Sequence, residues 1–236
     1  MLDLPIEDLL SAGVILIAVI INAAIFIKSY KSWRENQLTQ TLLFALTAIF
    51  MAIAMLLLVA ERLFLTLGDN DLGMLFGLIA ITVSGFAVVS IDSFSFNIVF
   101  PKKYKVLTVF SACIEALYLG FWYFDPARRV ESGEIILSDL TELLPFFTLV
   151  PLLVIPVIVF FYYAIKVRNE SPVSSKRSWI LGGGVAIIST GFIIEIVGLD
   201  PTTQPWAPPV IVFGRTLFII GALLLYWGLF RLKSKE

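Results

Sequence analysis

Histidine is absent from this chain of 236 residues, and cysteine occurs once, as Cys113 inside an apolar stretch. Without histidine there is no His-ligated haem, zinc or copper, no Ser-His-Asp triad and no imidazole proton relay. A single cysteine forms neither an intramolecular disulfide nor a thiolate cluster for a metal. We therefore expect no metal site, no cofactor and no enzymatic activity.

Charged residues are also scarce. They make up 15% of the chain, against 59% hydrophobic residues, whereas a typical soluble domain has about 25% charged residues. The apolar residues fall into blocks close to the ~20 residues that cross a bilayer, and no polar stretch is long enough to hold a soluble core. The sequence predicts an all-α membrane protein, a single seven-transmembrane helix bundle over residues 1–236. The expected spans are 9–27, 41–65, 73–100, 106–124, 143–165, 179–197 and 208–230.

Lysine and arginine are nearly missing from one side of these spans, and this asymmetry orients the chain. Most of the 17 Lys and Arg residues fall between spans 1 and 2, 3 and 4, 5 and 6, and after span 7, while the alternate loops are acidic. Because cytoplasmic loops are the basic ones, we expect the N-terminus outside, the C-terminus in the cytoplasm and a rhodopsin-like topology. The protein would then lie in the cell membrane, with the lipid bilayer as its first partner. The basic residues are Lys28, Lys31 and Arg34; Lys102, Lys103 and Lys105; Lys166, Arg168, Lys176 and Arg177; and Arg231, Lys233 and Lys235.

Two local patterns leave alternatives open. In the loop before span 5, β-forming residues flank a Ser-Gly turn over 128–137. This pattern fits either a small hairpin that caps the outer mouth of the bundle or an irregular tether.

Span 5 contains Pro145, Pro151 and Pro156, each of which removes a backbone donor. The helix is either kinked and movable beside a cavity, or simply one of many membrane helices that contain proline.

Six charged residues lie within the expected spans, where a charge is costly unless it is paired or hydrated. Counting about 1.5 Å per residue places five of them in the outer half of the membrane. The same count leaves Asp92 alone, roughly 10 Å from the cytoplasmic end of its span. The six are Glu61 and Arg62 in span 2, Asp92 in span 3, Glu115 in span 4, Glu195 in span 6 and Arg215 in span 7.

Arg215 is the strongest candidate among them for a binding role. In a compact bundle, span 7 commonly neighbours spans 2 and 6, so Glu61 and Glu195 are its expected partners, with Arg62 close by. This group forms either an outer pocket for a small anionic or zwitterionic ligand, or a buried ion pair that fixes helix packing.

Glu115 and Asp92 are the candidates for buried or proton-relaying carboxylates, together with Glu195. Asp92 belongs to a polar run in which Ser90, Ser93 and Asn97 share one helical face. Side chains of this kind either join neighbouring membrane helices or form part of a network that transmits a signal.

Lysine is absent from the interior of every span. Retinal in microbial rhodopsins is attached through a lysine deep in the seventh span, and Arg215 cannot form that Schiff base. Covalent retinal is therefore excluded, while a pigment held without a covalent bond is not. The lack of histidine likewise excludes the zinc-dependent seven-span hydrolases of the ceramidase and adiponectin-receptor type.

Residues 160–232 carry several loose motifs. They are Asn169-Glu170-Ser171-Pro172, Lys176-Arg177-Ser178-Trp179, Leu181-Gly182-Gly183-Gly184, Gly198-Leu199-Asp200-Pro201 and Tyr226-Trp227-Gly228-Leu229-Phe230. Together with Phe100-Pro101 and the hairpin pattern at 128–137, they make the chain similar to the seven-helix N-terminal sensor region of bacterial and archaeal histidine kinases. The resemblance implies a sensor that acts on an output domain. Because none follows the last span here, it implies a separate partner; it transfers no ligand-binding residue.

The sequence thus favours a seven-helix sensor or receptor-like module with an outer polar pocket. It would signal through a separate cytoplasmic or membrane partner, and no nucleic acid is expected to bind. Two alternatives stay open, a small transporter or proton-translocating protein and a structural subunit of a membrane complex. A polar path that joins Asp92 to Glu115 would favour transport, and an outer pocket sealed beneath by apolar packing would favour sensing.

Overall fold

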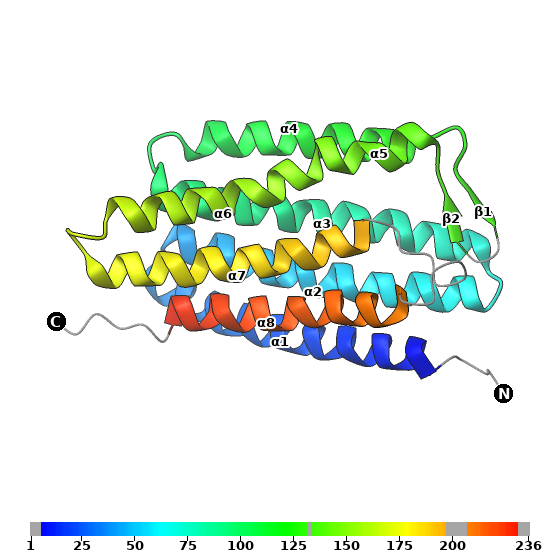
Figure 1. The fold of residues 1–236 in the computed structure, drawn as a ribbon, viewed down its shortest axis with the longest axis horizontal. Coiled ribbons are helices and arrows are strands. Elements are labelled where there is room, and N and C mark those ends of the chain that lie inside the picture. Colours follow the sequence, from blue (N-terminus) through cyan, green and yellow to red (C-terminus); the bar gives the residue numbers. More distant parts are fainter. Residues whose placement is uncertain (1–5, 132–133, 197–206, 231–236) are drawn as a thin grey trace. The chain divides into compact units, whose positions relative to one another are not determined.

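A computed structural model describes residues 6–131, 134–196 and 207–230 as helices joined by short connections (Figure 1). Two short strands, β1 (Arg129–Glu131) and β2 (Glu134–Ile136), lie between the fourth and fifth helices. The helices are α1 (Ile6–Asn36), α2 (Thr39–Thr66), α3 (Asn70–Val99), α4 (Tyr104–Tyr123), α5 (Asp139–Phe147), α6 (Leu149–Lys166), α7 (Pro172–Ile196) and α8 (Ala207–Phe230).

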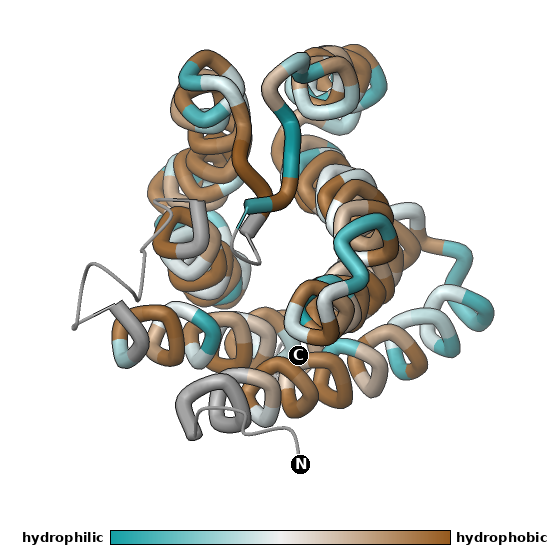
Figure 2. Tube along the Cα trace, turned by 90° about the vertical axis from the view of Figure 1, so that its right-hand side faces the viewer, coloured by the Kyte–Doolittle hydropathy of each residue, from teal (hydrophilic) through white to brown (hydrophobic). Residues whose placement is uncertain are grey.

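Seven helical segments in this part of the chain are long and apolar enough to cross a membrane, with α5 and α6 together forming one of them. The helices are predominantly hydrophobic, and polar residues gather at their ends (Figure 2). Large apolar side chains face outwards, such as Val106 at 74% and Phe147 at 76% exposed, whereas Asp92 is fully buried. This arrangement is the reverse of a soluble protein. The prediction of an all-α, multi-pass membrane protein with seven spans is confirmed.

Several helices extend beyond the predicted spans into the polar connections. The first helix continues to Asn36, so Lys28, Lys31 and Arg34 lie on its last turns instead of in a loop. The helix that carries Lys176 begins at Pro172, seven residues before the predicted start. Proline fits the first turn of a helix, where the missing N–H has no helical partner. The apolar blocks mark the membrane-crossing part of each helix, and the helix itself is longer.

The fifth span is interrupted where α5 ends and α6 begins. Thr148 separates them, with φ −117° and ψ −69°, and its hydroxyl donates to the Leu144 carbonyl at 2.9 Å. Pro151 has no N–H to offer the carbonyl of Phe147, the last residue of α5, so the regular helical ladder stops there. The structure shows that this proline-rich helix is interrupted at Thr148, and its movement beside a cavity stays a prediction.

The chain forms two compact units, a middle unit (Asn22–Leu152) and a terminal unit (Met1–Ile21 with Leu153–Glu236). In the middle unit, α3 packs against both α2 and α4. The α2–α3 turn is set by Gly68, whose φ of +80° suits glycine. The N–H of Asp69 closes the turn on the Phe64 carbonyl at 3.0 Å, as in a Schellman motif. This tight turn fixes α3 antiparallel to α2.

The connection between α4 and α5 contains an antiparallel hairpin, which is one of the two alternatives that the sequence left open. Val130 pairs with Ile135 in the register of β1 and β2. Ile135 reaches the end of the α2–α3 pair, since a Cβ built on Gly77 would lie 3.1 Å from its Cδ1 atom. The hairpin therefore packs on the middle unit instead of hanging free.

In the terminal unit, α7 and α8 approach each other through glycines. A Cβ built on Gly191 would lie 2.8 Å from the Gly214 carbonyl oxygen, and one on Gly184 would lie 3.1 Å from that of Gly221. Small residues allow this backbone approach between membrane helices. The glycine-rich start of span 6, expected from the sequence to serve close helix packing, has that role at Gly184.

Candidate functional site

The α3–α4 interface of the middle unit buries a glutamate. Glu115 on α4 is only 3% exposed, and its side chain lies against the backbone of Gly85 on α3. A Cβ built on Gly85 would come within 2.8 Å of the Glu115 Cδ and 2.9 Å of its Cγ. No side chain larger than hydrogen fits at position 85 while Glu115 keeps this position.

Asp92, on the same helix as Gly85, is 0% exposed. Its carboxyl faces the Ser111 hydroxyl, and it interacts electrostatically with Glu115 across the interface. Asp92 and Ser111 approach each other outside good hydrogen-bond geometry. Among the described residues, neither carboxyl has a hydrogen-bond partner for its two oxygens, and the Ser111 hydroxyl has none either. Two buried acids thus lie together without a cation or a donor to stabilise a negative charge on either of them.

The register of the two helices explains how these acids meet. Two hydrogen bonds connect α3 to α4 on either side of the pair. The Thr108 hydroxyl donates to the Ser93 hydroxyl at 2.9 Å, and the hydroxyls of Thr82 and Tyr123 are 2.9 Å apart. On α4, Thr108, Ser111 and Glu115 follow a spacing of three and four residues, which places them on one face.

The chemistry that this arrangement supports is the gain and loss of protons. A buried carboxylate without a partner is strongly disfavoured, and a second negative charge nearby adds repulsion. Gain or loss of a proton at either carboxyl sets the charge at this interface. A change in its protonation changes the charge at a contact that has no spare room.

A third acid, Asp125, organises the loop after α4. Its Oδ1 accepts from the Ala127 N–H at 2.7 Å. Its Oδ2 accepts from the N–H and hydroxyl of Ser138, at 3.0 and 2.8 Å. Hydrogen bonds from Thr141, then from Ser138 and Ala127, hold the pKa of the Asp125 carboxyl well below its usual range. Asp125 thereby ties both ends of the hairpin connection together.

The structure describes three of the four side chains of the predicted outer pocket, and the pocket itself stays a prediction. Glu61 is half-buried, and a Cβ on Gly77 would lie 3.1 Å from its Cδ, next to the hairpin residue Ile135. Arg62 is exposed. Arg215 is half-buried in α8 and takes part in an interaction. Glu61 and Arg62 belong to the middle unit and Arg215 to the terminal unit.

Glu195 lies in the last turn of α7. Its side chain lies outside the described part of the structure, so the pairing of Glu195 with Arg215 stays a prediction.

The neighbourhood of Asp92 and Glu115 is the feature that sequence reasoning missed. Counting from the helix ends placed the two acids in opposite halves of the membrane. The α4 helix has only 20 residues, so Glu115 is roughly 16 Å from its first residue and Asp92 roughly 10 Å from the last residue of α3. The two depths differ by about one helical turn. Gly85, seven residues before Asp92 on the same face, was the available signal.

Comparison with models of known protein families and with curated proteins finds no match to this chain.

Proposed function

We propose that this protein is a seven-helix membrane sensor in which the carboxyl pair Asp92–Glu115 is the responsive element. In this proposal the N-terminus lies outside the cell, the C-terminus lies in the cytoplasm, and the topology is rhodopsin-like. The orientation rests on the basic residues, since Lys102, Lys103 and Lys105 flank the start of α4 and basic ends face the cytoplasm.

The observation that carries the proposal is the burial of two unpartnered carboxyl groups at one helix–helix contact. Ionisable groups inside membrane helices are costly, and those that persist usually serve function. The pair is faced by Ser111 and by Tyr118, one turn further along α4. The neighbouring α2 contributes Glu61 and Arg62 as its only charged residues, both near its far end. The protonation of the pair is therefore set mainly by the two acids themselves.

Transmission follows from the packing. Glu115 packs directly against Gly85 with no free space between them, so a change of charge at the pair shifts α4 against α3. Both helices lead to the turn at residues 100–103, which carries Lys102 and Lys103. A shift there would be presented to a cytoplasmic signalling partner with an acidic surface.

The test uses Cys113, the single cysteine, which is exposed on α4 two residues before Glu115. An environment-sensitive dye on Cys113 is followed from mildly acidic to mildly alkaline pH in lipid nanodiscs. We expect a reversible change in the wild type that is lost in Glu115→Gln and shifted in Asp92→Asn. Glu131→Gln, a carboxyl-to-amide change on the exposed hairpin, is the matched control and should keep the wild-type response. A wild-type response that survives Glu115→Gln would overturn the proposal.

Proton translocation is the second candidate, and one observation favours it. Polar side chains follow the α3–α4 contact from Thr82 and Tyr123 through Glu115 and Asp92 to the Ser93–Thr108 pair. In proteoliposomes with an enclosed pH indicator, a transporter gives a proton flux that disappears in Glu115→Gln. A sensor gives no such flux but keeps the Cys113 dye response.

The proposed orientation is tested with an impermeant maleimide on intact cells. In a Cys113→Ser background, a cysteine at Glu131 should be labelled from outside, and one at Lys103 should be labelled only after the membrane is opened. The reverse pattern would invert the orientation.

The polar residues Arg215, Glu61, Arg62 and Glu195 are proposed, as the sequence indicated, to bind a small anionic or zwitterionic ligand at the outer side. Support for this comes from Arg215, a half-buried cation inside a membrane helix.

A further inference from the structure

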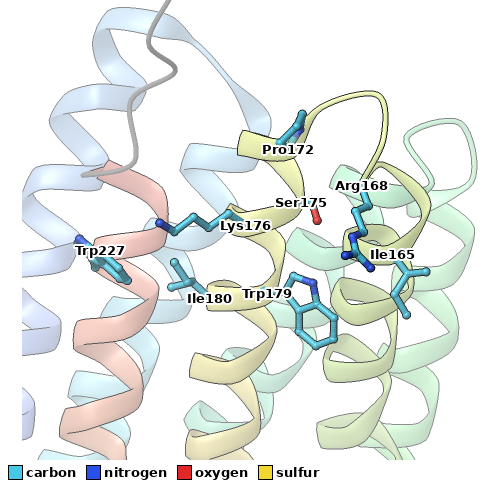
Figure 3. A pocket seen from close by; sticks show the side chains of 8 residues that line it. All are labelled: Ile165, Arg168, Pro172, Ser175, Lys176, Trp179, Ile180 and Trp227. Atoms are coloured by element: carbon cyan, nitrogen blue, oxygen red, sulfur yellow. The ribbon is translucent and has the colours of Figure 1, made fainter.

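A groove lies in the terminal unit, where the last turns of α6 and α8 meet the first turns of α7, with a volume of about 690 Å³. It crosses the surface of α7 (Figure 3). Among its lining residues, two carry a positive charge and two carry a large aromatic ring. These are Arg168, Lys176, Trp179 and Trp227.

The two cations in the groove do not hold the described helices together. Among the described residues, no hydrogen bond or ion pair is made by the side chain of Arg168 or Lys176, and no Asp or Glu lines the groove. Their neighbour Arg177 behaves differently, because it donates to the carbonyls of Gly228 at 3.0 Å and Leu229 at 3.2 Å on α8. Lys176 extends towards the Trp227 side of α7, whereas Arg168 lies near Trp179 in the space between α6 and α7 (Figure 3). The groove thus presents positive charge at both of its ends.

The walls of the groove are apolar and held in place. Trp179 packs on Phe161, with ring centroids 4.9 Å apart, and is still 47% exposed, while Trp227 is 43% exposed. Ile165 and Ile180 provide further apolar surface. One turn before Trp179, the Ser175 hydroxyl donates to the Ala164 carbonyl at 2.8 Å and joins α7 to α6. Tryptophan rings of this kind lie at the depth of lipid head groups.

We propose that this groove is a binding site for an anionic phospholipid of the bilayer. The phosphate of the head group lies at the Arg168 end, Lys176 adds attraction from the other end, and the acyl chains run along Ile165, Trp179 and Ile180 towards the membrane interior. Basic pockets between membrane helices recognise anionic head groups in this manner. Because no acid lines the groove, it offers no partner for the cation of a zwitterionic lipid, and its positive charge attracts an anionic lipid more strongly. This proposal does not depend on the proposed sensing function.

The experiment follows tryptophan fluorescence of the full-length protein in nanodiscs that contain brominated phosphatidylglycerol or brominated phosphatidylcholine. Bromine quenches only nearby rings, so we expect stronger quenching by the anionic lipid. Trp179→Phe with Trp227→Phe should remove that difference. Arg168→Gln with Lys176→Gln should weaken the apparent affinity for phosphatidylglycerol roughly thirtyfold, since two basic residues near the surface contribute about 2 kcal/mol together.

The matched control is Lys102→Gln with Lys103→Gln, which removes the same charge from another exposed basic turn. It should keep the wild-type preference. Equal quenching by the two lipids in the wild type would contradict a specific site. An equal loss of affinity for phosphatidylglycerol in the Arg168/Lys176 and Lys102/Lys103 variants would contradict it as well. Relief of quenching by inorganic phosphate at the concentration of the lipid phosphate would mean that a soluble anion is the ligand, and would also overturn the proposal.

Discussion

Gly85 on α3 lies directly against Glu115 on α4, so closely that an added Cβ would stand 2.8 Å from the glutamate Cδ. We predict that Gly85→Ala destabilises the protein by about 1–3 kcal/mol, because the new methyl group must displace Glu115 or separate the helices. Thermal unfolding in detergent measures the loss. Combining the change with Glu115→Ala should restore most of it, with a coupling energy of at least about 1 kcal/mol.

Gly120 on α4 provides the control for this cycle, since a Cβ there would meet nothing within 4 Å. Gly120→Ala should leave the protein as stable as the wild type or raise its stability by up to about 1 kcal/mol, the gain in helix propensity. Additive effects of Gly85→Ala and Glu115→Ala would show that the two side chains do not meet, and would remove the geometric basis of the responsive pair.

Asp125 should make the outer connection sensitive to acid. Its pKa in the folded protein is lowered by hydrogen bonds from Thr141, Ser138 and Ala127, so its contribution to stability is complete above the unfolded value of about 4. The contribution is lost as the pH falls below about 4 towards the folded pKa. We expect the melting temperature of the wild type to fall in that range.

In Asp125→Asn the melting temperature should be lower at neutral pH and should fall less on acidification. Asp139→Asn is the control, because Asp139 is an exposed acid in the first turn of α5. Equal acid sensitivity of the wild type and Asp125→Asn would show that Asp125 does not control it.

The spans could be predicted because an apolar block of ~20 residues matches the thickness of the bilayer. The chain has too little polar sequence to cover such blocks in a soluble fold. Their ends could not be predicted, since the helix continues into water wherever capping and turn chemistry allow. Thus α1 runs on through Lys28 and Arg34, and Asp69 caps α3 by accepting from the Leu72 N–H at 3.1 Å. The break at Thr148 was open in the sequence, because proline in a membrane helix does not always interrupt it.

The candidate site shows a different limit. Sequence identified Asp92 and Glu115 one by one, as charges that a membrane helix should not carry without a reason. It did not bring them together, because their proximity depends on the offset between two antiparallel helices of 30 and 20 residues. That offset is fixed by the turn at residues 100–103 and by the fit of Glu115 against Gly85. Composition and hydropathy reveal neither, and Gly85 on the face of Asp92 was the available signal.

Arg177 should stabilise the end of α8. Its guanidinium donates to the Gly228 and Leu229 carbonyls at 3.0 and 3.2 Å, which belong to the last described turn of α8. Arg177→Ala is expected to cost about 1.5–3 kcal/mol, the range for hydrogen bonds with a charged group. The neighbouring Lys176→Ala removes the same charge without a hydrogen bond, and should change the melting temperature little. Equal effects of the two substitutions would mean that charge, and not the carbonyl contacts, matters at this position.

Arg215 lies half-buried on the membrane helix α8 and takes part in an interaction there. Its replacement tests whether that interaction stabilises the fold. Arg215→Leu should destabilise the protein by about 1–2 kcal/mol, less than a fully buried pair because the side chain is partly exposed. Arg215→Lys should keep part of this contribution, because it retains the charge but loses the planar fork of donors. Arg62→Leu removes an exposed arginine from α2 and serves as the comparison, with little expected change. If Arg215→Leu unfolds at the wild-type temperature, its interaction does not hold the helices together. A role for Arg215 would then have to be sought in ligand binding, by testing small anions for stabilisation of the wild type but not of the leucine variant.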